Sequence, residues 1–227
     1  MDILTPSLCL GVVFTLTTAL LTLGDLNYTF FFKQWNIGQR PDIYGEDIIH
    51  VLPTVIRNLV ITGPVVLSTF YIRVRLFGDE PLITNPILWL LSVYSVSQVV
   101  FWAMHFMVHG SRTLYLAIHQ QHHEYTKPFA LTAIYCSVYE MLLLNLPAVY
   151  FAQLIFLPAT DCLFFAHCFW LTLVGIQTPF AHSGLTLFGS QYHDLHHSLF
   201  TYNFGSPILD KIFGVYKEEK IVNKRLI

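Results

Sequence analysis

Eight of the eleven histidines in this chain fall in three short windows. The windows are an HxxxH pair, His105 and His109, and two copies of HxxHH: His119, His122 and His123, then His193, His196 and His197. On a helix, residues three and four positions apart share one face. Each window is therefore expected to aim two or three imidazoles at one point, and imidazole is the commonest metal ligand in proteins.

The number of histidines predicts two metal ions. His182, which follows an apolar run and precedes Ser183 and Gly184, is expected to be a ninth ligand. Nine imidazoles exceed the four ligands of a structural zinc site but fit two metals with four or five nitrogens each. Imidazole suits zinc, copper, iron and nickel, so the ligand type leaves the metal open. The four cysteines form no CxxC pair and are interpreted as buried thiols.

A ligating imidazole needs an acceptor for its second ring nitrogen, which fixes its tautomer. The candidate acceptors are Glu124, Glu140 and Asp194, with Asp210 and Gln121 as further possibilities. Glu140 stands out because it lies inside a long apolar run, where an ionisable side chain is costly. Besides His182, two histidines lie outside the windows: His167 is interpreted as a hydrogen-bonded core residue and His50 as an interfacial one.

The composition indicates a membrane protein. The chain is 54% hydrophobic and only 11% charged, with a mean hydropathy of +0.55, whereas a soluble domain carries about 25% charged residues. A net charge of −2 provides no basic excess that would indicate a nucleic-acid partner. Five apolar runs are long enough to enter or cross a bilayer: residues 3–23, 51–77, 86–108, 130–157 and 162–181.

The basic residues predict an orientation. If all five runs cross, the histidine windows share one side with ten of the twelve basic residues: Lys33, Arg40, Arg57, Arg112, Lys127, Lys211, Lys217, Lys220, Lys224 and Arg225. Only Arg73 and Arg75 fall on the other side. Positive residues concentrate on the cytosolic side, so the histidines and the C-terminus are expected to be cytosolic. The predicted fold class is an all-α integral membrane protein with about four to five membrane-embedded helices and a cytosol-facing, histidine-rich di-metal site.

The order of motifs resembles that of the fatty acid hydroxylase (sterol desaturase) superfamily: HxxxH, HxxHH, a lone HSG and a final HxxHH among apolar runs. Similar segments include residues 122–131, 193–204 and 209–214, and the spacing of Asn58 and Pro64. The resemblance covers residues 51–216 and is closest to cholesterol 25-hydroxylase-like members, whereas C-4 methylsterol oxidases often carry a histidine where Ser137 stands. Two departures are Leu185 after HSG and the short separation of His182 from His193.

The first apolar run is interpreted as a membrane anchor, so residues 1–50 are expected to form an N-terminal membrane anchor and interfacial segment. A fatty acid hydroxylase-like domain is expected over residues 51–227. The resemblance implies an iron-dependent lipid or sterol monooxygenase of the endoplasmic reticulum membrane whose motif histidines hold two iron ions. O2 would be the co-substrate, with electrons from NAD(P)H passed through cytochrome b5 or a reductase. The substrate would be a sterol or related lipid in the bilayer, hydroxylated at a C–H bond. C-4 methylsterol oxidation or desaturation is the alternative within the family, and a non-catalytic metal-binding membrane protein is the alternative from another class.

Overall fold

The computed structural model describes residues 4–26, 45–78, 80–156, 161–184 and 190–218. Every regular element within these ranges is a helix, which confirms the all-α fold class. Predictions that concern Lys33, Arg40, Leu185 and the basic residues after 218 lie outside the described residues.

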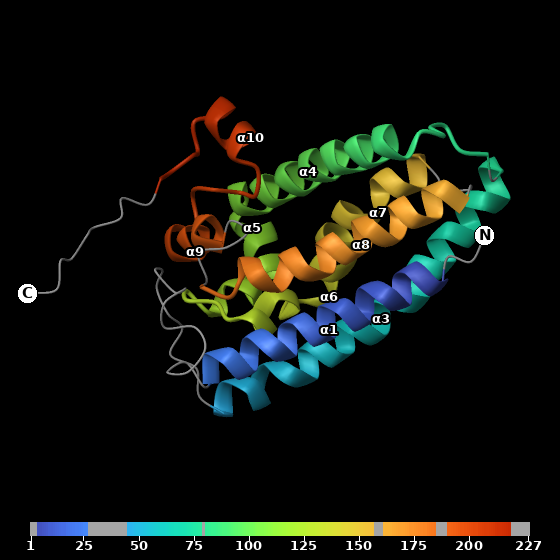
Figure 1. Cartoon of the computed structure of the whole chain (residues 1–227). Helices are drawn as coiled ribbons and strands as arrows, with labels where there is room; N and C mark the ends of the chain where they lie inside the picture. The colour runs from blue at the N-terminus through green and yellow to red at the C-terminus, as the bar shows by residue number, and fades with distance from the viewer. Residues whose placement is uncertain (1–3, 27–44, 79, 157–160, 185–189, 219–227) are drawn as a thin grey trace, which may run out of the picture.

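Four of the described helical stretches are long and apolar enough to cross a membrane. They are α3 (Gly45–Phe77), α4 (Pro86–Gly110), the continuous helical stretch Val138–Ile155, and Phe164–Ala181 within α8 (Asp161–Ala181). Helix α1 (Leu4–Leu26) packs along α8, and α4 packs along α7 (Leu146–Ile155). Figure 1 shows these helices side by side. Many of their large apolar side chains face outward, as expected for helices that contact lipid.

The predicted start of the fourth apolar run was wrong. Residues 130–137 contain a 3₁₀ helix, η3 (Ala130–Ile134), followed by extended backbone, and the membrane-length helix begins only at Val138. Asn58 of α3 holds this segment in place, because its buried side-chain amide donates to the carbonyl oxygens of Ile134 and Cys136 at 2.8 and 3.0 Å. Apolar residues here pack inside the protein instead of facing lipid, which hydropathy alone cannot distinguish.

The first HxxHH window does not lie on a regular α-helix. After the single turn α5 (Arg112–Leu114), the chain forms a π-helix, η1 (Tyr115–His119), and then a 3₁₀ turn, η2 (His122–Glu124). The amide of Gln120 donates to the carbonyl of Tyr115, five residues earlier, at 2.9 Å. Such π-turns occur frequently at functional sites. The second window does lie on an α-helix, α9 (Ser190–Leu199).

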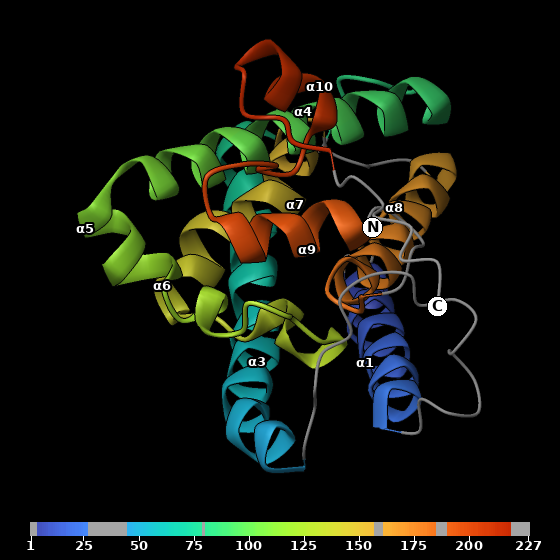
Figure 2. The same cartoon turned by 90° about the vertical axis from the view of Figure 1, so that its left-hand side faces the viewer.

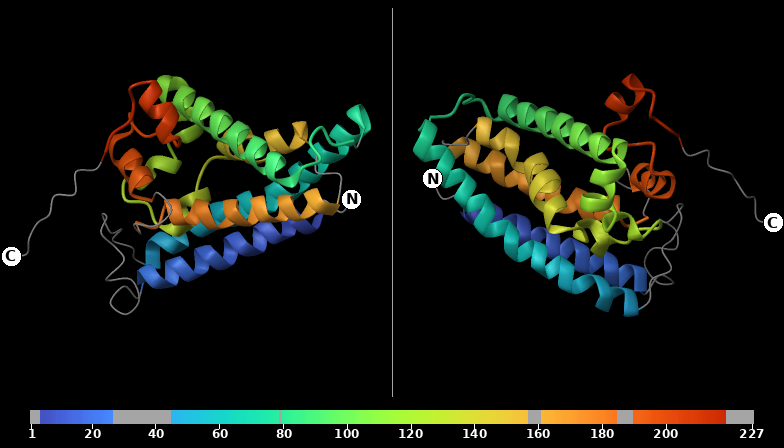
Figure 3. Two further views of the ribbon diagram at one scale, coloured as in Figure 1. Left: turned by 45° about the horizontal axis from the view of Figure 1, so that its top comes forward. Right: turned by 180° about the vertical axis from the view of Figure 1, so that it is seen from behind.

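One end of the bundle collects the elements that carry histidines. The C-terminal ends of α4 and α8 meet α5 and α9 there, and α10 (Pro207–Ile212) lies beyond them (Figures 1 and 2). The opposite end holds the loop between α3 and α4, as both views in Figure 3 show. The expected gathering of the histidine windows on one side of the protein is therefore present. Helix α3 begins at Gly45, before the expected domain start at residue 51.

His167 lies in the core near the other end of α8, fully buried between the rings of Phe70 and Trp89. The prediction of a core histidine holds, but neither ring nitrogen has a hydrogen-bond partner among the described residues. Cys136 is buried and is a free thiol, and Cys168 is half-buried.

Candidate metal centre

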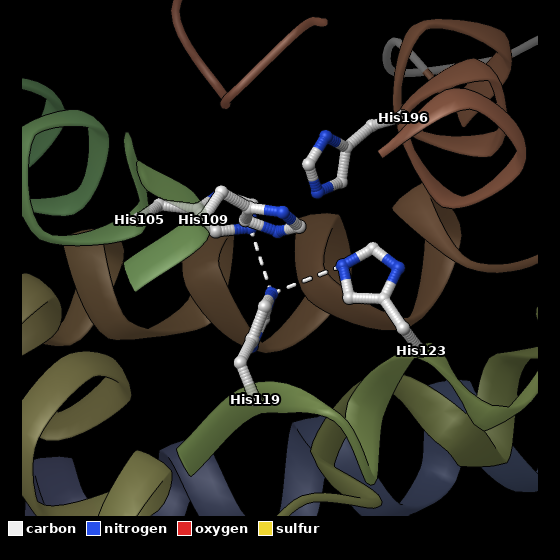
Figure 4. A group of neighbouring side chains, drawn as sticks. All are labelled: His105, His109, His119, His123 and His196. Carbon is white, nitrogen blue, oxygen red and sulfur yellow. Dashed lines mark hydrogen bonds between the residues drawn. The ribbon is translucent and has the colours of Figure 1, made fainter. Parts of the chain in front are cut away.

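The nine predicted ligands form two groups. His105, His109, His119, His123 and His196 make the first group, and His122, His182, His193 and His197 make the second; within each group one nitrogen per residue lies within 4.8 Å of all the others. All nine are buried except the half-buried His109. Figure 4 shows the rings of the first group converging from α4, the 119–123 segment and α9. The structure therefore brings together every histidine that the sequence singled out as a ligand.

The expectation that each window points at one site was wrong for both HxxHH windows. His119 and His123 belong to the first group, but His122 between them belongs to the second. The second window is divided in the opposite sense: His193 and His197 belong to the second group, and His196 belongs to the first. Each HxxHH window thus contributes to both groups, while the HxxxH pair contributes to one.

Four of the nine imidazoles have a fixed tautomer. Their Nδ1 atoms face backbone carbonyl oxygens at 2.7 to 3.1 Å: His105 faces Phe204, His182 faces Thr178, His196 faces Tyr202 and His197 faces Tyr125. A carbonyl oxygen only accepts, so Nδ1 carries the proton and Nε2 presents a lone pair. This arrangement is the one that metal-ligating histidines require.

The lone pairs point at one another. Nε2 of His193 lies 3.0 Å from Nε2 of His182 and 3.2 Å from Nε2 of His197. Both neighbours present bare lone pairs, and His193 has at most one proton on Nε2 to donate. At least one of the two neighbouring lone pairs is therefore left without a hydrogen-bond donor in a buried site. A cation among the three nitrogens would supply the missing partner.

The nitrogen spacing is that of neighbouring ligands on a metal. In the first group, Nε2 of His119 lies 2.9 Å from Nε2 of His105 and 3.0 Å from Nε2 of His123. Two nitrogens bonded to a metal at about 2.1 Å are about 3.0 Å apart when their bonds meet at a right angle, and about 3.4 Å apart in a tetrahedron. The spacing in the first group fits a metal with ligands near right angles, and the spacings of 3.0 to 3.2 Å in the second group lie between the two geometries. The residues present therefore fit two ions, one in each group.

Burial favours the neutral form that binds metal. It lowers the pKa of all seven group members that lie outside the membrane-spanning helices, namely His119, His122, His123, His182, His193, His196 and His197. The pKa of His182 is lowered to about 4. Neighbouring imidazoles lower most of these pKa values further, since a second positive charge would lie close by. At neutral pH these imidazoles are therefore unprotonated at one nitrogen and able to coordinate.

Glu140 lies against both groups. Its Oε2 is 2.9 Å from Nδ1 of His119, and its Oε1 is 3.9 Å from Nδ1 of His122. The side chain is almost completely buried, and Ser137 begins its helix by accepting from the Glu140 amide while donating to the carbonyl of Ile118. The carboxylate is therefore close enough to pair with His119, whereas 3.9 Å from His122 is beyond hydrogen-bond range, and neither contact has hydrogen-bond geometry. The acceptor role of Glu140 stays a prediction.

The other predicted acceptors have different surroundings. Glu124 accepts a hydrogen bond from Tyr135 at 2.7 Å and lies 3.1 Å from Nε2 of His50, outside both groups. Asp194 is buried on α9. Asp210 accepts from the indole of Trp102 at 2.7 Å and from the amide of Phe204 at 3.2 Å. Asp210 therefore acts on the histidines only through the loop that precedes it.

That loop, residues 200–206, is the part of the site that the sequence did not predict. Its carbonyl groups at Tyr202 and Phe204 accept from one histidine each of the first group. Phe200 and Asn203 have positive φ angles of 62°, a conformation in which asparagine is enriched among non-glycine residues. Asn203 was therefore a local sequence signal for a sharp turn, although not for carbonyl groups aimed at histidines.

A cavity of about 860 Å³ runs from the histidines into the bundle. His105, His119, His122, His182 and His193 line one end of it, and Tyr94, Tyr150 and Trp170 line the part farther along α4, α7 and α8. From His105 to Tyr94 is eleven residues, or about 16 Å along α4. Most of the wall between them is apolar and comes from α1, α3, α4, α7 and α8. Its size and lining suit the apolar body of a lipid.

Comparison with known proteins places these features in a family. The model of the fatty acid hydroxylase family matches residues 90–215, just over half of the chain. The chain is 30% identical over 220 residues to a putative methylsterol monooxygenase of Dictyostelium discoideum, covering 86% of this chain and 80% of that protein. It is 35% identical over 130 residues to sphinganine C4-monooxygenase 1 of Arabidopsis thaliana (50% and 48% covered). It is 27% identical over 203 residues to a very-long-chain aldehyde decarbonylase of Oryza sativa (79% and 76%). No solved structure matches the chain.

Proposed function

The chain belongs to the fatty acid hydroxylase family, and from that premise we propose that it is a membrane di-iron oxygenase that uses O2 to hydroxylate a C–H bond of a sterol or related lipid. The observation that carries the proposal is the position of the two histidine groups at the end of a lipid-sized, largely apolar cavity. A purely structural metal site has no need of such a cavity.

The residues of the two groups would hold one iron each. Iron bound there would supply the activation of O2 that an unreactive C–H bond requires, whereas zinc has no redox chemistry. Iron is also supported by the right-angle spacing of the nitrogens in the first group and by the five imidazoles of that group, more than the four ligands of a structural zinc site.

The surrounding residues prepare the site without reacting themselves. Glu140 orients His119 and lies near His122, and the carbonyl groups of Tyr202 and Phe204 fix the tautomers of His196 and His105. The apolar cavity wall holds the lipid and excludes water from the reacting carbon, which protects reactive species from side reactions.

The relatives support lipid oxidation but differ in reaction. Their names describe methylsterol oxidation, sphinganine hydroxylation and aldehyde decarbonylation. C-4 methylsterol oxidation and desaturation are therefore the alternative reactions for the same site. The proposed setting is the endoplasmic reticulum membrane, with the histidine end and the C-terminus in the cytosol. Electrons would come from NAD(P)H through cytochrome b5 or a reductase.

The test is metal content followed by product analysis. Protein purified in detergent is compared with the double variant His122→Ala/His123→Ala, which removes one ligand from each group, and with His50→Ala, a histidine outside both groups. We expect about two irons per chain in the wild type and in His50→Ala, a large loss in the double variant, and O2-dependent oxidation of sterols only where iron is retained. Protein that binds no metal after expression with ample iron would refute the proposal, and so would bound iron with no O2-dependent product from any lipid.

A further inference from the structure

Two glutamines line the cavity inside the membrane-spanning part of the bundle. Gln98 lies on α4 and Gln177 on α8, and these helices contact each other and both end at the histidine groups. Gln98 precedes His105 by seven residues and Gln177 precedes His182 by five. At 1.5 Å per residue, both side chains start at about the same level, roughly 7 to 10 Å from the histidines.

Within the part of the chain that the structure describes, neither amide has a hydrogen bond to another residue. Other polar side chains of the spanning helices do: Thr62 donates to the carbonyl of Asn58, and Gln153 donates to the carbonyl of Val149. Ser97, next to Gln98 on the cavity wall, is buried and its hydroxyl also lacks a partner. Ser97 is buried, Gln98 is half-buried and Gln177 is exposed. An unpaired polar group in a membrane interior is costly and is by default functional, and this cost applies most strongly to Ser97 and Gln98.

The charge of the cavity limits what these amides can bind. Among the described residues that line it, none is lysine or arginine, and the single carboxylate is Glu140 at the histidine end. A phosphate, sulfate or carboxylate group would therefore enter without a counter-ion. A hydroxyl group carries no charge and both donates and accepts, as a glutamine amide does.

We propose that Gln98 and Gln177 bind a hydroxyl group of a neutral lipid substrate and so select which lipid, and which of its carbons, reaches the histidine groups. This inference rests on the proposed lipid oxygenase function and adds the class of substrate. With the hydroxyl held about one and a half to two helical turns from the histidines, the oxidised carbon lies several carbon–carbon bonds away from it. Oxidation of a carbon next to that hydroxyl is not compatible with this placement.

Binding to two matched lipid pairs tests the proposal. Cholesterol is compared with cholest-5-ene, and 1-octadecanol with octadecane, so that each pair differs only in the hydroxyl and the two pairs separate a sterol from a linear alcohol. Radiolabelled lipid is bound to metal-loaded, full-length protein in nanodiscs. The wild type is expected to prefer at least one hydroxylated lipid over its counterpart by fivefold or more.

The variants are Gln98→Leu/Gln177→Leu and, as a second version, Gln98→Met/Gln177→Met. Neither removes a hydrogen bond that the described structure contains, so both are expected to fold. Each should lose the hydroxyl preference while still binding the hydroxyl-free lipid. Gln153→Leu is the matched control, because Gln153 is buried on α7 but does not line the cavity; it should retain the preference.

Three results would overturn the inference: a wild type that binds none of the four lipids, a wild type without hydroxyl preference, or double variants that keep the preference. Product analysis separates this inference from the proposed function. Oxidation next to the hydroxyl, or at an unchanged carbon and rate in both double variants, would overturn the role of the glutamines and leave the oxygenase standing. Binding that depends on the glutamines, without oxidation of any lipid, would support the subsite and refute the oxygenase.

Discussion

Glu140 provides the sharpest test of how the protein prepares its two proposed metal sites. One buried carboxylate contacts a histidine of each group: Oε2 lies 2.9 Å from Nδ1 of His119, and Oε1 lies 3.9 Å from Nδ1 of His122. In Glu140→Gln the side chain keeps its volume but loses its charge and one of its two acceptor oxygens. The remaining amide oxygen can still face Nδ1 of His119 but carries no negative charge, and Nδ1 of His122, already 3.9 Å away, no longer has a carboxylate beside it.

The magnitude follows from the role of such acceptors. Removing the partner of a ligating imidazole typically costs 10- to 100-fold in metal affinity or activity, which corresponds to about 1.4 to 2.8 kcal/mol. Glu140→Gln keeps one acceptor, so we expect about a tenfold loss of affinity for ferrous iron. Glu140→Ala removes both oxygens and should approach the hundredfold limit.

The assay is anaerobic competition for ferrous iron between the detergent-purified protein and a chelator of known affinity. Glu124→Gln is the matched control, because Glu124 contacts Tyr135 and His50 and no histidine of either group. Size-exclusion elution and helical content verify that each variant is folded. If Glu140→Gln binds iron as tightly as Glu124→Gln does, Glu140 does not support the ligands and the reasoning fails.

Three further predictions concern the surroundings of the site. In Asp210→Ala, the Trp102 indole and the Phe204 amide lose their acceptor, so the free energy of unfolding should fall by about 1–3 kcal/mol, measured as a lower thermal midpoint than in the surface control Lys211→Ala. Burial raises the pKa of the Cys136 thiol well above its usual value, and the negative charge of Glu140 raises it further. Because the thiol stays protonated, the peptide that contains Cys136 should react slowly with iodoacetamide at pH 8 in the folded protein and rapidly after denaturation. Removal of metal with a chelator should increase hydrogen exchange in α9 far more than in α7, because α9 supplies three imidazoles to the two groups and α7 supplies none; equal protection before and after chelation would argue against bound metal.

The sequence was sufficient to predict what the site is made of. Residue type and spacing identified all nine histidines that form the two groups, together with Glu140, because metal binding requires specific donor atoms that are rare in an apolar chain. Hydropathy predicted α3, α4 and α8 closely, since a helix that faces lipid must be apolar over its whole length. Both signals are local, and each can be recognised within a short window of residues.

The sequence was insufficient to predict the contacts that backbone atoms make with the histidines. The carbonyl groups of Phe204, Tyr202, Thr178 and Tyr125 that fix the imidazole tautomers carry no side-chain signature. Residues 130–137 are as apolar as a spanning helix, but they pack inside the protein under Asn58. Distinguishing burial against protein from burial against lipid requires the tertiary contacts.

The division of each HxxHH window between the two groups explains why the motif has this form. On α9, successive residues are rotated by about 100° around the helix axis, so residues four apart differ by only about 40°. His193 and His197 therefore share one group, while His196 points about 100° away from His197 into the other. A plain HxxxH pair, such as His105 and His109, lacks this third direction and serves one group. Both HxxHH windows contribute to both groups, with opposite assignments, so that two ions bound there would lie side by side. The doubled histidine at the end of the motif is thus the feature that divides each window between the two groups.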